Sequence, residues 1–246
     1  MAPTQPSDSI QDFVTFMTAM FGRDVYASRR GATQEDVVTL ARCCPHPFPQ
    51  LYREYLLEFG EDAGGFEFAF DTLSDIQSLL AFHDPDEPPL PPEQPEDCFV
   101  FAIENASGGR VLDFSDCKSG KSTEPTVASY YADDLDYTYS KTFRIFLYGA
   151  GFIEGRIKPP RPSRWTLISQ VPSQMQDLLA VAVRCGFVPY WFSDEYMSCL
   201  ERGGESLVMR TQGGMTSIVV VASDDAKTAD IRSQLLQSFP LVAEKR

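Results

Sequence analysis

Two cysteines and a histidine lie close together and could carry out chemistry. Cys43 and Cys44 stand just before His46. A thiol beside an imidazole is the arrangement of a thiol hydrolase, in which the imidazole accepts the proton of the thiol. The same side chains could bind zinc, but a structural zinc site needs two spaced pairs of ligands, and the chain has no Cys-x-x-Cys pair. We therefore predict no metal and no cofactor, and interpret His46 and His83 as structural or surface residues.

Two short motifs resemble ligand-binding loops but lack essential positions. Gly120-Lys121-Ser122 has the form of the end of a phosphate-binding loop, but Ser115 stands where that motif requires glycine. The acidic residues Asp133, Asp134 and Asp136 begin like a calcium-binding loop, yet neither its central glycine nor its closing glutamate follows. We therefore interpret this second segment as an acidic loop that is solvated or binds a partner.

The C-terminal third offers one concentration of reactive side chains, listed here: Trp191, Asp194, Glu195, Tyr196 and Cys199. An enzyme active site is one interpretation of this group. Aromatic and carboxylate residues in a strand and loop more often serve packing and solvation, and function must be argued from a site rather than from a fold. We therefore predict that the chain is not an enzyme and has no catalytic residues.

The hydrophobic periodicity predicts helices and strands in alternation along the chain. Apolar residues spaced by three and four positions indicate helices at 9–21, 34–44, 49–60, 72–82, 142–148, 172–185 and 226–239. Alternating or continuous apolar runs indicate strands at 66–70, 98–103, 111–114, 126–131, 165–171, 187–192, 207–212 and 215–222. The sequence Thr33-Gln34-Glu35-Asp36 has the form of a capping box and places the start of the second helix.

These elements predict the α+β class with two domains. Residues 1–158 would form a mixed domain in which helices pack on a mainly antiparallel sheet, preceded by an N-terminal helix. The proline-rich segment 159–164 would be a linker. Residues 165–246 would form a smaller α+β domain of ferredoxin-like type.

The charge of the chain is concentrated in one segment. The chain has a formal net charge of −14, and residues 61–140 hold 18 Asp and Glu against three Lys and Arg. A nucleic-acid binder needs a basic stripe, and the sequence shows none.

The sequence also has no apolar run long enough to span a membrane, and we expect no secretion signal at its start. The six cysteines then indicate reduced thiols in a cytoplasmic protein.

Residues 33–152 carry an ordered set of motifs. These are the helix residues Pro49, Tyr52, Tyr55, Leu56, Phe59 and Gly60, the pair Gly64-Gly65, a strand at 99–103, the pair Gly108-Gly109, a strand ending at Asp113, and a helix with Thr142, Phe143, Phe146 and Leu147. In this order they resemble the SUKH superfamily, which contains yeast cell-wall-synthesis regulators of the Smi/Knr type and bacterial immunity proteins. The resemblance implies a non-catalytic α+β domain that binds another protein.

Resemblance and charge together predict a bacterial immunity protein that occludes the active site of a cognate toxin with acidic loops. The toxin would be basic and nuclease-like, because an acidic surface attracts a basic partner. The predicted partner-binding residues are Asp84, Asp86, Glu87, Glu93, Glu96, Asp97, Tyr130, Tyr131, Asp133, Asp134 and Asp136. The alternative is a regulatory or scaffold protein of the Smi/Knr type with a host protein as partner. The sequence does not specify an oligomeric state.

Overall fold

The computed structural model describes residues 9–24, 26–68, 72–84, 96–105, 108–131, 134–159, 163–169, 175–212 and 214–238. The chain divides into two compact units: an N-terminal unit of Pro6–Ala150, and a C-terminal unit of Gly151–Arg246 with Met1–Gln5. The division falls within the helix Phe143–Phe152, ahead of the segment 159–164 that was predicted as a linker. Residues 160–162 of that segment lie outside the described residues.

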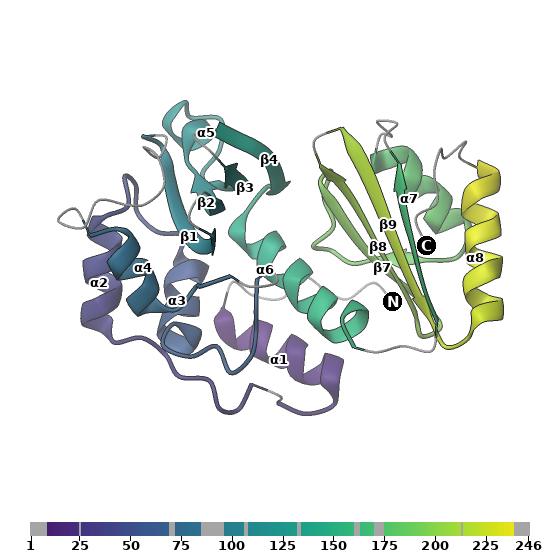
Figure 1. The fold of residues 1–246 in the computed structure, drawn as a ribbon, viewed down its shortest axis with the longest axis horizontal. Helices are drawn as coiled ribbons and strands as arrows, with labels where there is room; N and C mark the ends of the chain where they lie inside the picture. Colours follow the sequence, from purple (N-terminus) through teal and green to yellow (C-terminus); the bar gives the residue numbers. More distant parts are fainter. Residues whose placement is uncertain are drawn as a thin grey trace. The chain divides into compact units, whose positions relative to one another are not determined.

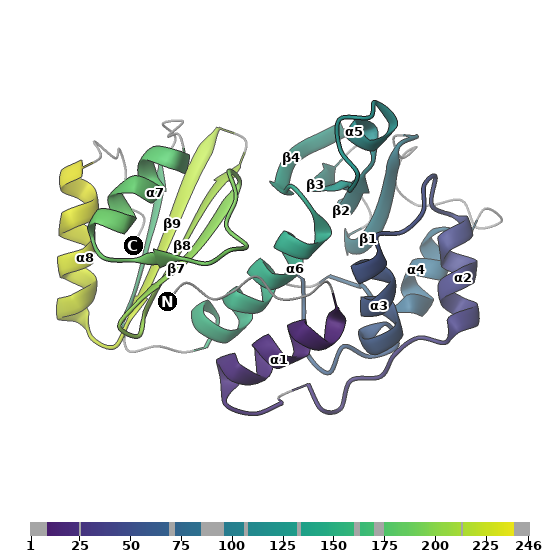
Figure 2. The same cartoon turned by 180° about the vertical axis from the view of Figure 1, so that it is seen from behind.

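The N-terminal unit consists of helices followed by a four-stranded sheet and a further helix (Figure 1). Its elements are α1 (Ile10–Phe21), α2 (Gln34–Arg42), α3 (Gln50–Phe59), α4 (Ile76–Phe82), β1 (Cys98–Asn105), β2 (Gly108–Asp113), α5 (Ser115–Lys118), β3 (Thr126–Tyr131), β4 (Asp134–Ser140) and α6 (Phe143–Phe152). Helices α2, α3 and α4 lie side by side, as Figures 1 and 2 show from opposite sides. The strands are antiparallel throughout, in the order β1-β2-β3-β4.

Local capping explains where the helices begin. The Thr33 hydroxyl accepts a hydrogen bond from the Asp36 backbone N–H at 3.1 Å, which confirms the capping signal that the sequence predicts. The Asp75 carboxylate accepts one from the Ser78 N–H at 2.9 Å and so starts α4 later than the predicted residue 72. Side-chain caps of this kind satisfy the backbone donors that the first turn of a helix leaves without partners.

The core between sheet and helices is built largely from aromatic rings. The Tyr52 ring of α3 lies 5.8 Å from the ring of Phe101 on β1 and 5.0 Å from that of Phe143 on α6. The planes of the rings in these two pairs meet at 67° and 68°, which is close to edge-to-face. This arrangement adds to the stabilisation that comes from burying the rings. Phe66 and Phe68 are buried in the same core but lie in an irregular segment, so the strand predicted at 66–70 is wrong for its described part. The apolar residues alternate in this segment because Phe66 and Phe68 both face the core, although the segment pairs with no strand in its described part.

A glycine allows the segment before α2 to lie directly against α3. A Cβ atom on Gly31 would stand 1.7 Å from the carbonyl oxygen of Leu57, far inside contact distance. The neighbouring Ala32 N–H donates to the Leu56 carbonyl at 2.9 Å and holds the two segments together. Glycine is therefore required by the close approach of two backbones.

The C-terminal unit contains a five-stranded antiparallel sheet with the order β5-β9-β8-β7-β6. Its elements are the π-helical turn η1 (Ile153–Ile157), β5 (Ser163–Ser169), α7 (Met175–Arg184), β6 (Val188–Pro189), β7 (Met197–Arg202), β8 (Glu205–Gln212), β9 (Met215–Ala222) and α8 (Asp225–Ser238). The ferredoxin-like prediction is wrong, because four consecutive strands separate the two helices, whereas that fold alternates them as β-α-β-β-α-β. The strand β7 was missed because its first four residues are all buried and give no alternation.

Both helices cover one face of this sheet (Figure 1). Leu178 of α7 and Ile231 of α8 are buried with sheet residues such as Leu207 and Val220. The π-helical turn η1 also packs on this sheet, against β8 and β9. Its Arg156 donates a hydrogen bond to the Glu201 carboxylate of β7 at 2.6 Å. The predicted α+β class is thus confirmed for both units. No described helix combines the length and the apolar character of a transmembrane span.

Candidate functional site

The thiols near His46 lie in surroundings that oppose nucleophilic chemistry. Burial raises the pKa of the Cys44 thiol to about 11, and burial together with the nearby Asp84 carboxylate raises the pKa of Cys43. The His46 ring stacks on Phe114 at 4.9 Å. Only a thiolate is an effective nucleophile or metal ligand, and these thiols stay protonated at neutral pH. Within the described residues, no three His, Cys, Asp or Glu side chains are arranged to hold a metal ion.

The reactive side chains of the C-terminal unit shape a turn before β7. The Asp194 carboxylate accepts hydrogen bonds from the N–H groups of Tyr196 at 2.8 Å and Met197 at 2.9 Å. Cys199 is fully buried, and that burial raises the pKa of its thiol. A carboxylate bonded to nearby backbone N–H groups is an Asx-turn, which organises the chain locally. This geometry therefore favours structural roles over the alternative of an active site.

The structure describes five of the nine acidic residues that the sequence predicts to bind a partner, and these five come from two segments of the chain. Asp84 and Glu96 are exposed, while Asp97 is partly buried and forms an ion pair with Lys118 at 3.1 Å. Asp134 and Asp136 belong to the strand β4, so the acidic segment is not wholly a loop. Asp86, Glu87, Glu93 and Asp133 lie outside the described residues.

The two predicted tyrosines have opposite surroundings. Tyr131 is 55% exposed at the end of β3, opposite Asp134 in the register of the sheet. Tyr130 is buried with Val100, Val111 and other residues on the sheet. The prediction that Tyr130 contacts a partner is therefore corrected, because neighbouring side chains on a strand point to opposite faces and its face is covered.

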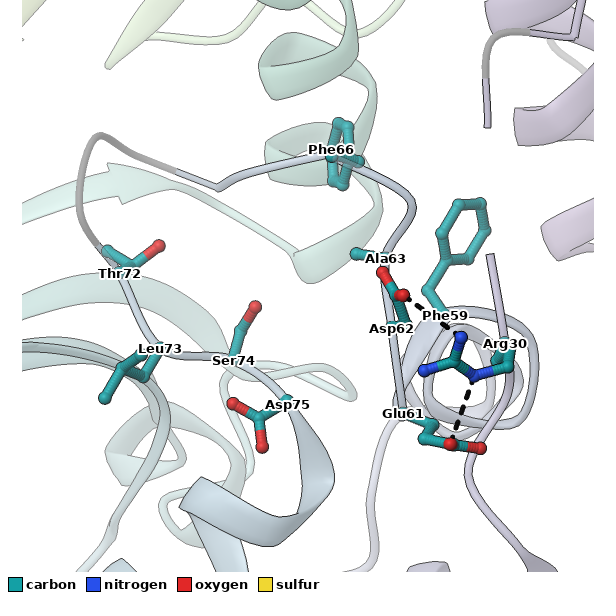
Figure 3. Close-up of a pocket in the computed structure, with 11 residues that line it drawn as sticks. Arg30, Phe59, Glu61, Asp62, Ala63, Phe66, Thr72, Leu73, Ser74 and Asp75 are labelled. Carbon is teal, nitrogen blue, oxygen red and sulfur yellow. Dashed lines mark hydrogen bonds and ion pairs between the residues drawn. The ribbon is translucent and has the colours of Figure 1, made fainter. Parts of the chain in front are cut away.

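A cavity of about 330 Å³ in the N-terminal unit brings together residues that are distant in sequence. Figure 3 shows Thr72, Ser74 and Asp75 on one side of it and Arg30 with Asp62 on the other. Its other lining residues are Phe59, Glu61, Ala63, Gly65, Phe66 and Leu73. Phe59 and Phe66 are buried core residues, whereas Leu73 is 55% exposed. The lining of the cavity thus includes two buried aromatic residues and one exposed apolar residue.

Backbone hydrogen bonds hold the two sides of the cavity in place. The Arg30 N–H donates to the Asp62 carbonyl at 2.7 Å, and the Glu61 N–H donates back to the Arg30 carbonyl at 2.9 Å. On the opposite side, Leu73 exchanges two hydrogen bonds of 2.8 Å with Ile103 of β1. Segments fixed in this way form the walls before any ligand arrives, which lowers the conformational cost of binding.

The electrostatics of the cavity are acidic. The Arg30 guanidinium contacts Glu61 at 3.1 Å and Asp62 at 3.4 Å, as Figure 3 shows. Asp75 adds a third carboxylate, which accepts hydrogen bonds from the N–H and hydroxyl of Ser78. Three carboxylates against one guanidinium leave an excess of negative charge, so the cavity favours a cationic group.

None of the cavity carboxylates belongs to the set predicted from the sequence. The prediction followed dense acidic runs, whereas the cavity draws single residues from three segments around 30, 61–66 and 72–75. The close pair Gly64-Gly65 was a signal, since both residues have positive φ angles of 64° and 92° and turn the chain beside the cavity. Comparison with family models, curated proteins and solved structures finds no match for this chain.

Proposed function

We propose that this chain is a non-catalytic protein-binding module of the SUKH type, and that it acts in the bacterial cytoplasm as an immunity protein. Its partner is a basic, nuclease-like toxin, whose active site it occludes. The order of elements from α2 to α6 supports the SUKH-type fold. Tyr52, Tyr55, Leu56 and Phe59 of the α3 motif are all buried, as are Phe143, Phe146 and Leu147 of α6.

The observation that carries the proposal is the acidic cavity within a strongly acidic unit. Residues 6–150 hold 25 Asp and Glu against 10 Lys and Arg, a net charge of −15. The cavity lies in this unit and has room for a lysine or arginine side chain between the two carboxylate-bearing walls. Long-range attraction speeds the encounter with a basic partner, and a side chain that the partner buries in the cavity would add binding energy at short range.

The test begins by capturing the partner from the native host with the full chain and measuring the affinity of the purified pair. Glu61→Lys reverses a carboxylate of the cavity that is 54% exposed and ion-paired with Arg30. Asp116→Lys is the matched control, because Asp116 is 51% exposed, is ion-paired with Lys121 and does not line the cavity. We expect about tenfold weaker binding for Glu61→Lys and a much smaller loss for the control.

Equal losses for the two variants would mean that the cavity is not the binding site. The toxin assignment has its own readout, which is the activity of the captured protein. A toxin should lose its activity at a stoichiometric amount of this chain, and co-expression should rescue cells from it. A captured host protein that keeps full activity would instead establish the regulatory or scaffold alternative.

A further inference from the structure

The C-terminal unit has a regular strand at one edge of its sheet. β5 pairs with β9 at every residue from Ser163 with Ala222 to Ser169 with Thr216, without a register shift. No other described strand pairs with β5. Alternate residues of an edge strand direct their N–H and C=O groups away from the sheet, where they can pair with another strand.

The other sheet edges are less suited to pairing. β6, at the opposite edge of the same sheet, has only two residues, Val188–Pro189. β1, an edge of the N-terminal sheet, has two irregularities in its register with β2. β4, the other edge of the N-terminal sheet, contains two irregularities in its register with β3 and carries Asp134 and Asp136. Short strands, bulges and charges are devices that protect an edge from pairing. β5 has 7 residues and no register shift, and its single charged residue is the exposed Arg164.

A helix face lies next to this edge. α8 packs on β5 and β9, and a groove of about 420 Å³ follows its residues Ala229, Arg232, Ser233, Leu236 and Gln237. The Arg232 guanidinium lies 5.9 Å from the ring centroid of Trp165 on β5, which places this face of α8 on the β5 side. Ala229 and Ser233 are small and one turn apart, so another helix can approach closely there.

Two further observations indicate which molecule would cover this edge. The Trp165 side chain is 8% exposed, and its indole N–H has no acceptor among the described residues, although buried donors normally have one. Residues 151–246 hold 10 Asp and Glu against 11 Lys and Arg, so the net charge of this unit would not oppose the association of two copies. A strongly charged partner is better matched to the N-terminal unit, whereas a nearly neutral surface suits a second copy.

We propose that two copies of this chain associate through the C-terminal unit, with β5 pairing antiparallel to its counterpart and the two α8 faces in contact. The interface is isologous, since a two-fold axis brings the same strand and helix of each copy together. It joins two five-stranded sheets into one continuous sheet. The inference does not depend on the proposed function, which concerns the other unit.

Sedimentation equilibrium of the full chain tests the proposal directly. We expect a mass near twice the 27.5 kDa of one chain, decreasing towards 27.5 kDa on dilution. Ile168→Lys, at an exposed position of β5, and Ala229→Glu, on the α8 face, should each raise the dimer dissociation constant by about tenfold or more. The matched control Val188→Lys on β6 replaces an exposed residue outside the interface and should leave the dissociation constant unchanged.

Amide hydrogen exchange of the unaltered protein gives a readout that does not depend on how a variant folds. Protection of β5 amides should increase with protein concentration, while that of β9 amides stays constant. A chain that remains at 27.5 kDa at its highest soluble concentration would overturn the proposal. So would a dimer that the β6 control disrupts and the β5 variant does not, or β5 protection that is independent of concentration.

Discussion

Tyr52 and Tyr55 present the same hydroxyl in two different surroundings on α3. The Tyr52 hydroxyl is buried without a hydrogen-bond partner among the described residues, whereas that of Tyr55 bonds the Ser74 side chain. Burial raises the pKa of both phenols. An unsatisfied buried hydroxyl costs free energy, so Tyr52→Phe should raise the free energy of unfolding by about 1 kcal/mol and Tyr55→Phe should lower it by about 1 kcal/mol. Urea denaturation of both variants measures the difference, and changes of equal sign would contradict this account.

His83 gives the protein a defined response to acid. Its Nε2 lies 2.8 Å from the Val100 carbonyl oxygen, and its ring stacks on Phe99 at 4.4 Å. Burial lowers the pKa of this imidazole from 6.5, so the folded protein binds the proton less readily than the unfolded chain. The stability that comes from the neutral ring is present above pH 6.5 and is lost as the pH falls.

We therefore expect His83→Gln to show a weaker decrease in the free energy of unfolding between about pH 7 and pH 5 than the unaltered protein. Denaturant unfolding at a series of pH values measures this slope. Identical slopes for the two proteins would show that the His83 proton equilibrium is not coupled to folding.

At the scale of single residues, the sequence predicts burial better than it predicts a site. The apolar side of α3, including Tyr52 and Phe59, follows from spacing alone, because a core face repeats with the helical period. The cavity residues Arg30, Asp62 and Asp75 have no common pattern, since their proximity arises from backbone pairing between segments far apart in the chain.

At the scale of the elements, the contact between α3 and the segment before α2 depends on one residue, Gly31. Gly31→Ala would place a Cβ 1.7 Å from the Leu57 carbonyl oxygen and force two backbone segments apart. We expect a loss of about 3 kcal/mol or more in the free energy of unfolding. Gly22→Ala is the control, because Gly22 has a positive φ of 72° but no atom within 4 Å of a new Cβ. Its cost should be about 1 kcal/mol, and equal losses in thermal or urea unfolding would argue against the close contact.

Most helices and the strands β1, β3, β8 and β9 are predictable because their apolar periods are clear. β4 was not predicted because Asp134 and Asp136 give an edge strand the polarity of a loop. Strand order in the C-terminal sheet was also not predictable, since β5 pairs with β9 across the whole unit and local patterns do not record such pairings.

For the whole molecule, the unequal charge of the two units predicts unequal responses to salt. The net charge of −15 on residues 6–150 repels itself, and added salt screens this repulsion. Raising sodium chloride from about 10 mM to about 150 mM should therefore slow exchange of the most protected amides in the N-terminal unit. Those of the C-terminal unit serve as the internal control and should change little. An equal response from both units would contradict this explanation.

The same difference in net charge between the two units affects how the protein adsorbs to charged surfaces. A cationic resin or an amine-coated sensor will adsorb it through residues 6–150, which hold the acidic cavity. Adsorption of this kind would orient the molecules and mask the cavity from a soluble ligand. Tethering through the nearly neutral residues 151–246 would avoid this adsorption through the acidic residues.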